Sequence, residues 1–358
     1  MHAFEPIPND PTSIGPAWMQ EALDSAGQAA GKTVVGAEFV GWIGTGQMAR
    51  NARFALTWDE PEGRPTSVVG KFPSDDPTGR TSGFEGGSYV NEWNFYRELA
   101  ATVRVRAPIC HVARFDEPHQ NFVLLMEDLS GSAQGDQMRG LTVDEAALAV
   151  EQAVALHGPR WGDTTLSAVV KRTPEEGAER LHAIYAATME GTLARLGENL
   201  EGDAIDLVRR FAPKVGAWVT CATAPHTLVH MDFRPDNFLF AVTADAPPLT
   251  VVDWQTVTVG PGTHDLAYMI GGSFEQAERA SAERGLVANY RERLAALGID
   301  YPLDACWRDY RTSSLWGVAM SVIATMLAAQ TDRGDQMFIT MLRRHARQAI
   351  DLQALDLV

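Results

Sequence analysis

The sequence has 358 residues, 45% of them hydrophobic and 21% charged, the balance of an ordinary globular protein large enough for two lobes. Its formal net charge of −16 disfavours nucleic acid and anionic membranes as partners, although solubility alone also explains so acidic a composition. Cys110, Cys221 and Cys306 form no CxxC pair, and neither a secretory signal nor a membrane-spanning stretch is visible, so we expect a cytoplasmic protein.

The first third of the chain has the pattern of a small antiparallel sheet with one key helix. Strands are predicted at 38–43, 53–58, 67–72, 109–115 and 121–126. Helices are predicted over 15–28 and, with amphipathic spacing, over 90–101. The Gly-, Asp-, Ser- and Thr-rich stretch 73–88 is expected to be a loop.

The rest of the chain is mainly helical. GSAQG, within 129–135, reads as a flexible connector. Helices are predicted at 143–156, at 204–219 and over most of 264–358, and short strands at 227–231, 238–242 and 249–254. We therefore expect an α+β protein with two lobes: a small antiparallel-sheet lobe, 1–129, and a larger helical lobe, 130–358.

Three polar residues that follow short apolar runs form the most informative motif. Asp232 and Asn237 are five positions apart in the segment HMDFRPDN, and Asp253 ends the run LTVVD sixteen positions later. Phosphoryl transfer needs a carboxylate near the attacking hydroxyl and hard oxygen ligands for Mg²⁺, which these residue types provide. Asp and Asn are also common in turns, so it is the ordered set that predicts a phosphotransferase.

HMDFRPDN resembles the catalytic loop of protein-kinase-like enzymes, H-x-D-x-x-x-x-N, and DWQ, from Asp253, stands where kinases carry D-F-G. With HDLA at 264–267, the chain most resembles small-molecule kinases: the aminoglycoside phosphotransferase, choline kinase and ecdysteroid-kinase-like group. The resemblance implies a bilobal protein-kinase-like fold with an ATP-binding amino-terminal lobe. It also implies ATP and Mg²⁺ as cofactors and a small-molecule hydroxyl as the acceptor.

The same resemblance implies roles for individual residues. Asp232 would be the catalytic base, and Asn237 and Asp253 would be metal ligands. His230 and Asp265 would mainly brace the loop.

Further charged residues complete the expected set. Arg234 would either neutralise charge near the γ-phosphate or hold the loop through an ion pair. Lys71, at the end of the strand SVVGKF, would hold the α- and β-phosphates, oriented by an ion pair with Glu92 in the following helix. Glu85 and Glu98 are the alternative partners of this lysine.

The glycine segment GTGQMA, at 44–49, loosely matches a dinucleotide-binding pattern, but a strand-like run rather than a helix follows it. A Walker A loop is also excluded, because glutamine stands where lysine is required. We expect instead a strand–turn–strand hairpin over ATP, with Gly44 and Gly46 at its turn.

The run NFVLLMEDL, at 121–129, resembles the hinge that joins the lobes of kinases. By that resemblance the Glu127 carbonyl would accept a hydrogen bond from the adenine amino group, the Leu129 N–H would donate to the ring, and Met126 would form the back wall. A buried strand followed by a polar turn is compatible with this role.

Other classes of protein explain the motifs less well. A pseudokinase-like nucleotide-binding scaffold should lack the base, a metal ligand or the strand lysine, and all are present. A protein kinase should carry an A-P-E triplet after Asp253, and this chain goes through GPG to HDLAY. His157 is expected to be structural. The acceptor stays open: acidic composition favours a cation, ecdysteroid-kinase-like features favour a bulkier alcohol, and the Trp and Met residues at 307–326 line its pocket or belong to the core.

Overall fold

The computed structural model describes residues 6–44, 48–168, 174–221, 225–328 and 330–358. The chain divides into two compact units. Unit 1 consists of Met1–Ala101, Ala107–Gly131 and Val252–Thr256, and unit 2 of Thr102–Arg106, Ser132–Val251 and Val257–Val358. Two short segments, 102–106 and 252–256, thus belong to a different unit from the residues on either side of them. The predicted lobe boundary at 129/130 stays a prediction.

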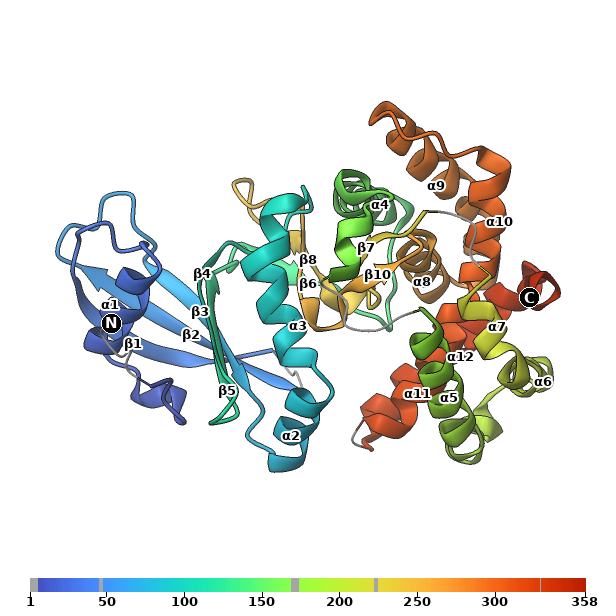
Figure 1. The fold of residues 1–358 in the computed structure, drawn as a ribbon, viewed down its shortest axis with the longest axis horizontal. Coiled ribbons are helices and arrows are strands. Elements are labelled where there is room, and N and C mark those ends of the chain that lie inside the picture. The colour runs from blue at the N-terminus through green and yellow to red at the C-terminus, as the bar shows by residue number, and fades with distance from the viewer. Residues whose placement is uncertain (1–5, 45–47, 169–173, 222–224, 329) are drawn as a thin grey trace. The chain divides into compact units, whose positions relative to one another are not determined.

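Unit 1 is built on a five-stranded antiparallel sheet with the strand order β1-β2-β3-β5-β4 (Figure 1). The strands are β1 (Val34–Ile43), β2 (Ala49–Trp58), β3 (Ser67–Pro73), β4 (Cys110–Asp116) and β5 (Asn121–Glu127). They match the five predicted strands, whose alternating side chains point to opposite faces of the sheet. On one face, Trp18 and Leu23 of α1 (Pro16–Ser25) join Phe54 and Phe72 in a single core.

A helical segment covers the other face of this sheet. α3 (Ser88–Asn94) continues into a π-helical turn, Phe95–Leu99, and a 3-10 turn, Ala100–Thr102. Tyr89 of α3 stacks on Phe122 of β5 with ring centroids 4.6 Å apart. This packing fixes α3, the start of the predicted helix, against β5, the strand that leads into the expected hinge.

The structure corrects the expected loop over 73–88, because α2 (Pro77–Glu85) lies inside it. The Asp76 side chain accepts a hydrogen bond from the Gly79 N–H, and Pro77 occupies the first helical position. A capped start therefore offsets a composition that otherwise favours turns.

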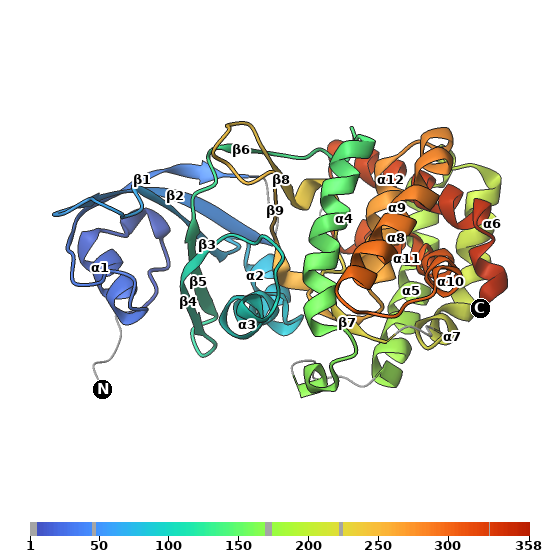
Figure 2. The ribbon, with the colours of Figure 1, turned by 90° about the horizontal axis from the view of Figure 1, so that it is seen from above.

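Unit 2 contains the remaining long helices and two small sheets (Figures 1 and 2). The helices are α4 (Val143–His157), α5 (Pro174–Leu196), α6 (Gly202–Phe211), α7 (Val215–Val219), α8 (Thr263–Ser273), α9 (Gln276–Ala296), α10 (Leu303–Ser313), α11 (Leu315–Leu327) and α12 (Asp332–Asp351). The strands are β6 (Ser132–Gln134), β7 (Thr227–Val229), β8 (Phe238–Ala241), β9 (Leu249–Val251) and β10 (Thr258–Gly260). Short 3-10 turns occur at Pro11–Ser13 in unit 1, Trp254–Thr256 in unit 1, and Gly158–Arg160, Thr164–Ala168, Gly197–Asn199, Ala212–Lys214, Pro235–Asn237 and Ala354–Leu357 in unit 2.

Two predictions for unit 2 are wrong in detail. The GSAQG connector is partly a strand, because β6 pairs antiparallel with β8. The single helix expected over 204–219 is divided into α6 and α7 by the 3-10 turn that contains Pro213.

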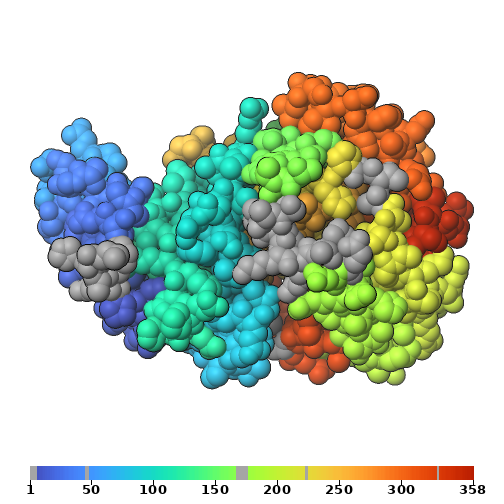
Figure 3. Space-filling model, in the orientation of Figure 1, coloured from blue at the N-terminus to red at the C-terminus, as the bar shows by residue number. Residues whose placement is uncertain are grey.

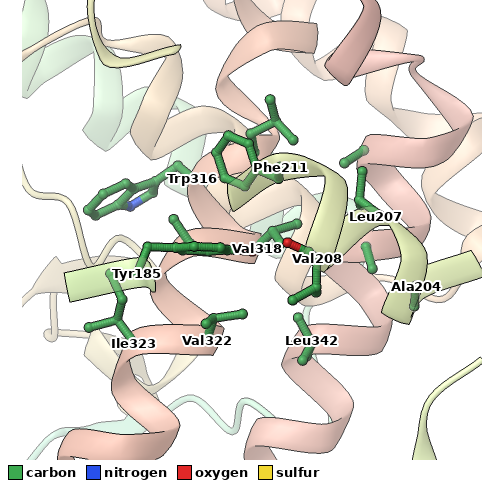
Figure 4. Packing of buried hydrophobic residues seen from close by; sticks show 14 of the residues in the cluster. Tyr185, Ala204, Leu207, Val208, Phe211, Trp316, Val318, Val322, Ile323 and Leu342 are labelled. Atoms are coloured by element: carbon green, nitrogen blue, oxygen red, sulfur yellow. Dashed lines mark hydrogen bonds between the residues drawn. The ribbon is translucent and has the colours of Figure 1, made fainter. Parts of the chain in front are cut away.

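The main core of unit 2 lies between α5, α6, α11 and α12 (Figure 4). Tyr185 and Phe211 meet edge to face with centroids 5.4 Å apart, and the Tyr185 hydroxyl donates to the Val208 carbonyl at 2.9 Å. Val322 and Leu342 join α11 to α12 in the same cluster. Among the described residues, no helix combines the length and the apolar character that crossing a bilayer requires.

Candidate active site

The loop at residues 230–237 of unit 2 carries three of the predicted catalytic and metal-binding residues. It follows β7 and ends in the 3-10 turn Pro235–Asn237, directly before β8. Phe233 is fully buried and packs edge to face on Phe238, with ring centroids 4.7 Å apart. This aromatic anchor fixes the middle of the loop, so the polar residues around it are held by packing as well as by hydrogen bonds.

Asp265, at the start of α8, holds the beginning of the 230–237 loop. Its carboxylate accepts the backbone N–H groups of His230 and Met231, both at 2.7 Å, and faces Nε2 of His157 at 3.1 Å. Met231 has a φ of 68°, a left-handed conformation that needs such support in a residue other than glycine. Asp265 thus occupies the position that a brace for this loop requires.

The Asp265 carboxylate is ionised although it is fully buried. Burial alone would raise its pKa, but the hydrogen bonds and charges of His157 and His230 outweigh burial and lower the pKa below its ordinary value. His157 is itself fully buried and contacts the Tyr290 hydroxyl through Nδ1 at 2.8 Å. His157 therefore lies in a structural network behind the loop, as its position at the end of a helix predicts.

The loop brings Asp232, Arg234 and Asn237 into direct contact. The Asn237 side-chain amide donates to the main-chain carbonyl and to Oδ2 of Asp232, both at 2.8 Å. Arg234 donates from Nε to Oδ1 of Asp232 at 2.9 Å and from Nη1 to Asp236 at 2.6 Å. Burial by itself lowers the pKa of Arg234, but the neighbouring acids, Asp232 foremost, raise it above its ordinary value.

Unit 1 contains the second group of predicted residues. Lys71 of β3 lies 2.6 Å from Oε2 of Glu92 in α3 and 2.9 Å from Oδ1 of Asp253. The side chains of Lys71 and Glu92 are buried. Of the three candidate partners, Glu92 is the one in contact, since Glu98 pairs with Arg97 and Glu85 lies exposed at the end of α2.

The pKa values of Lys71 and Glu92 depend on each other and on the nearby Asp253. Burial would lower the pKa of Lys71, but Asp253 and Glu92 together raise it above its ordinary value. The pKa of Glu92 is raised by burial and by Asp253, against the opposing effect of Lys71. The lysine therefore stays charged at neutral pH, with two carboxylates fixing the position of its ammonium group.

An aromatic stack that sequence reasoning missed holds Asp253 in place. Trp254 lies parallel to Phe95, with ring centroids 3.8 Å apart and an interplanar angle of 4°, and both rings are fully buried. The Trp254 backbone N–H donates to Oε1 of Glu92 at 3.3 Å, and Asp253 has a φ of 66°. The sequence signal for this stack is Phe95, shortly after Glu92 in the chain, together with the tryptophan that follows Asp253.

The residues predicted to form the hairpin over ATP and those predicted to contact the adenine all belong to unit 1. Gly44 directly follows β1 with a φ of 73°, which favours glycine, whereas Gly46 lies outside the described residues. Met126 and Glu127 are the last residues of β5, and Leu129 follows at a half-exposed position. Glu127 exchanges hydrogen bonds with the main chain of Ile109.

Asp128, between the predicted hinge residues Glu127 and Leu129, was not predicted to have a role. Its carboxylate accepts from the Ser67 hydroxyl at 2.7 Å and pairs with Arg53 at 2.8 Å. It ties the end of β5 to the adjacent strand β3 and to β2 beyond it.

A buried histidine of α12 gives unit 2 a testable pH dependence. His345 of α12 stacks on Tyr268 of α8 with ring centroids 5.0 Å apart, and burial lowers the pKa of His345 from 6.5 to about 3. Below pH 6.5 the unfolded chain takes up a proton that the folded protein refuses, so stability falls with pH towards 3. His345→Gln should therefore reduce the loss of unfolding free energy between pH 7 and pH 5 by about 2 kcal/mol.

Urea unfolding of both proteins at the two pH values measures this difference, whatever the absolute stability of the variant. His119→Gln is the matched control, because the His119 side chain is 79% exposed. An unchanged pH dependence in His345→Gln would show that His345 is not the group that titrates on unfolding.

The sequence matches one family of known proteins. A model described as the phosphotransferase enzyme family matches residues 50–302. No protein of curated function matches the sequence. No group of three or more His, Cys, Asp and Glu side chains suited to a metal ion occurs in the described part of the chain.

Three solved structures share the fold. A candidate aminoglycoside phosphotransferase from Ralstonia eutropha JMP134 is 16% identical, with 94% of this chain and 96% of that chain covered and a TM-score of 0.57. Plasmodium vivax ethanolamine kinase is 12% identical, with 86% and 81% covered and a TM-score of 0.54. Aminoglycoside 2′-phosphotransferase-IIIa, in complex with GDP, is 17% identical, with 88% and 93% covered and a TM-score of 0.54. The predicted α+β, bilobal protein-kinase-like fold is confirmed.

Proposed function

The chain belongs to the phosphotransferase enzyme family, the class of enzyme that its motifs predict, and from this premise we propose that it transfers the γ-phosphoryl group of ATP to a hydroxyl group of a small molecule. The observation that carries the proposal is the 230–237 loop. There a carboxylate, Asp232, is oriented by Asn237 and Arg234, while Asp265 holds the main chain from behind.

In the proposed reaction Asp232 receives the proton of the acceptor hydroxyl. The acceptor O–H bond breaks as the oxygen bonds to the γ-phosphorus, and the bond from that phosphorus to the β-phosphate oxygen breaks, which releases ADP. Asn237 and Arg234 each bond a different oxygen of the Asp232 carboxylate, so its orientation is set before the acceptor arrives. Arg234 and Lys71 are the cations that would stabilise the phosphate charge.

The nucleotide would be held by residues of unit 1. We assign the α- and β-phosphates to Lys71, and the covering hairpin to Gly44 and Gly46. Met126, Glu127 and Leu129 would contact the adenine. The GDP bound by one structural relative supports a nucleotide site of this kind.

Asn237 and Asp253 are the proposed Mg²⁺ ligands. An amide oxygen and a carboxylate oxygen are hard donors of the kind that Mg²⁺ prefers. Because the Asn237 nitrogen makes both bonds to Asp232, its oxygen is the atom to assign to the metal. When bound, Mg²⁺ supplies positive charge to the transferring phosphate. The two side chains are held independently, Asn237 by its bonds to Asp232 and Asp253 by Lys71.

The first experiment measures ATP consumption with a panel of acceptors that contains aminoglycosides, macrolides, choline-like amines, sugars, steroids and hydroxy acids. We expect at least one acceptor to stimulate release of ADP in proportion to the phosphate ester formed. Binding of ATP with no acceptor phosphorylated would instead identify a nucleotide-binding scaffold.

Lys71→Met tests the nucleotide side of the proposal. Loss of a charge-assisted contact to phosphate should weaken ATP binding by about 10- to 100-fold, measured by isothermal titration calorimetry. Thermal unfolding must be measured as well, because the variant leaves two carboxylates, Glu92 and Asp253, without their shared cation. Lys32→Met is the control, since Lys32 pairs with Glu60 at an exposed position. Equal ATP affinity in a folded Lys71→Met protein would remove Lys71 from the site.

A further inference from the structure

Helix α8 is buried along nearly its whole length. The helix that follows it, α9, lies at the molecular surface (Figure 3, orange), whereas every residue of α8 except His264 is buried. One of these buried residues, Tyr268, is 2% exposed and places a hydroxyl group within the hydrophobic core of unit 2. A buried hydroxyl group costs free energy unless it has a hydrogen-bonding partner, so its partner indicates its role.

The spacing of residues along α8 directs Tyr268 towards the 230–237 loop. Asp265 accepts two backbone N–H groups of that loop. Tyr268 is three residues further along, and residues three apart lie on the same face of a helix. Met231, which directly precedes Asp232, packs against the same core cluster as Tyr268. The face of α8 that holds the start of the loop therefore also carries the tyrosine.

The hydroxyl group of Tyr268 contacts the carboxylate of Asp232. The two side chains are hydrogen-bonded, and the charge of Arg234, which bonds the same carboxylate, also acts on the tyrosine. Burial, followed by the charge of Asp232, raises the pKa of Tyr268 well above its ordinary value. The hydroxyl group therefore keeps its proton and is the donor in this hydrogen bond.

Close packing between helices holds the ring of Tyr268. His345 of α12 lies parallel to it, with ring centroids 5.0 Å apart and an interplanar angle of 4°. A Cβ atom at Gly317 of α11 would lie 2.0 Å from Nδ1 of His345, and one at Gly271 of α8 would lie 2.8 Å from the same atom. Any larger residue at these two positions would displace the imidazole, so the glycines keep it against the tyrosine.

The other two side chains that bond Asp232 have competing roles. Arg234 also pairs with Asp236 and would stabilise phosphate charge, and Asn237 is a proposed metal ligand. Tyr268 is uncharged, and its ring is held by packing. Its hydrogen bond to Asp232 therefore does not depend on where the nucleotide or the metal draws Arg234 and Asn237.

We propose that Tyr268 is a positioning residue, which orients the Asp232 carboxylate towards the acceptor hydroxyl, and that His345 holds its ring in place for this purpose. This inference rests on the proposed function, because orienting Asp232 matters to the reaction only if Asp232 is the base. Tyr268 lies outside the motifs HMDFRPDN and HDLA, so neither of them assigns it this role.

Tyr268→Phe removes the hydroxyl group and keeps the ring. With saturating ATP and the best acceptor of the panel, kcat should fall by about 10-fold or more, because a hydrogen bond to a charged group is lost and the base is less well oriented. The KM for ATP should be unchanged. Tyr185→Phe is the matched control and should keep the wild-type kcat, since Tyr185 is fully buried in the same core and its hydroxyl donates to the Val208 carbonyl.

A double-mutant cycle measured by urea unfolding tests the contact without any turnover. Tyr268→Phe and Asp232→Ala are introduced into the full-length protein singly and together. If the two side chains interact, the unfolding equilibrium constant of the double variant should differ by about 5-fold or more from the value expected for independent changes. Tyr185→Phe combined with Asp232→Ala should show no such difference.

The outcomes separate this inference from the proposed function. Independent effects of Tyr268→Phe and Asp232→Ala on unfolding would overturn the contact. Coupled effects together with a wild-type kcat in Tyr268→Phe would overturn the positioning role and leave the proposed function in place. If the wild-type protein phosphorylates no acceptor, the proposed function and the positioning role both fail, and the unfolding cycle still reports the contact.

Discussion

Replacing Asp232 by asparagine should lower kcat by about 10²- to 10⁴-fold, the usual contribution of a positioned general base. Asparagine keeps the size of the side chain and still offers an oxygen to Asn237 or Arg234, which now contact the two carboxylate oxygens. It cannot accept the acceptor proton at neutral pH. The loss should therefore fall on kcat, with the affinity for ATP nearly unchanged.

Steady-state kinetics with saturating ATP and the best acceptor of the panel measures this effect. Asp245→Asn, at an exposed turn, is the control and should retain wild-type kinetics. Circular dichroism and thermal unfolding show whether the loop variant is folded. A folded Asp232→Asn protein with wild-type kcat would remove Asp232 from the chemistry.

Asp265→Asn should cost about 3–5 kcal/mol of unfolding free energy, because it removes a fully buried charge and leaves its hydrogen-bonding partners behind. The carboxylate, which is fully buried, now accepts two backbone N–H groups and contacts His157. An amide has one acceptor oxygen and a nitrogen that only donates, so at least one of these donors would lose its partner.

Urea unfolding at neutral pH tests this prediction, with Asp300→Asn at an exposed position as the control. Activity should fall together with stability, because the left-handed conformation of Met231 depends on the same carboxylate. A loss of less than about 1 kcal/mol would mean that Asp265 is not the main support of the loop.

The sequence predicts which of the candidate site residues belong together better than it predicts the elements around them. The order of Lys71, Glu92, Asp232, Asn237 and Asp253 is visible because phosphate chemistry restricts each position to one or two residue types. Their contacts within each unit follow from short segments: a strand and a helix for the lysine pair, and a tight loop for Asp232 and Asn237.

The missed elements depend on information that is not local. α2 has a turn-like composition and is stabilised by the Asp76 cap, and β6 is a three-residue strand that exists through its pairing with distant β8. No pattern near His157 indicates that Tyr290 is its partner, because the two residues are 133 positions apart. Parallel stacking of Phe95 on Trp254 likewise depends on tertiary packing.

Identification of the reaction product tests the central claim most directly. The protein is incubated with ATP, Mg²⁺ and each acceptor of the panel, and the products are analysed by ³¹P NMR and mass spectrometry, with Asp232→Asn in parallel. The account predicts a phosphate ester of one small-molecule hydroxyl, formed together with an equal amount of ADP and strongly reduced in the variant. ADP formed only with inorganic phosphate, or ester formed equally by both proteins, would contradict it.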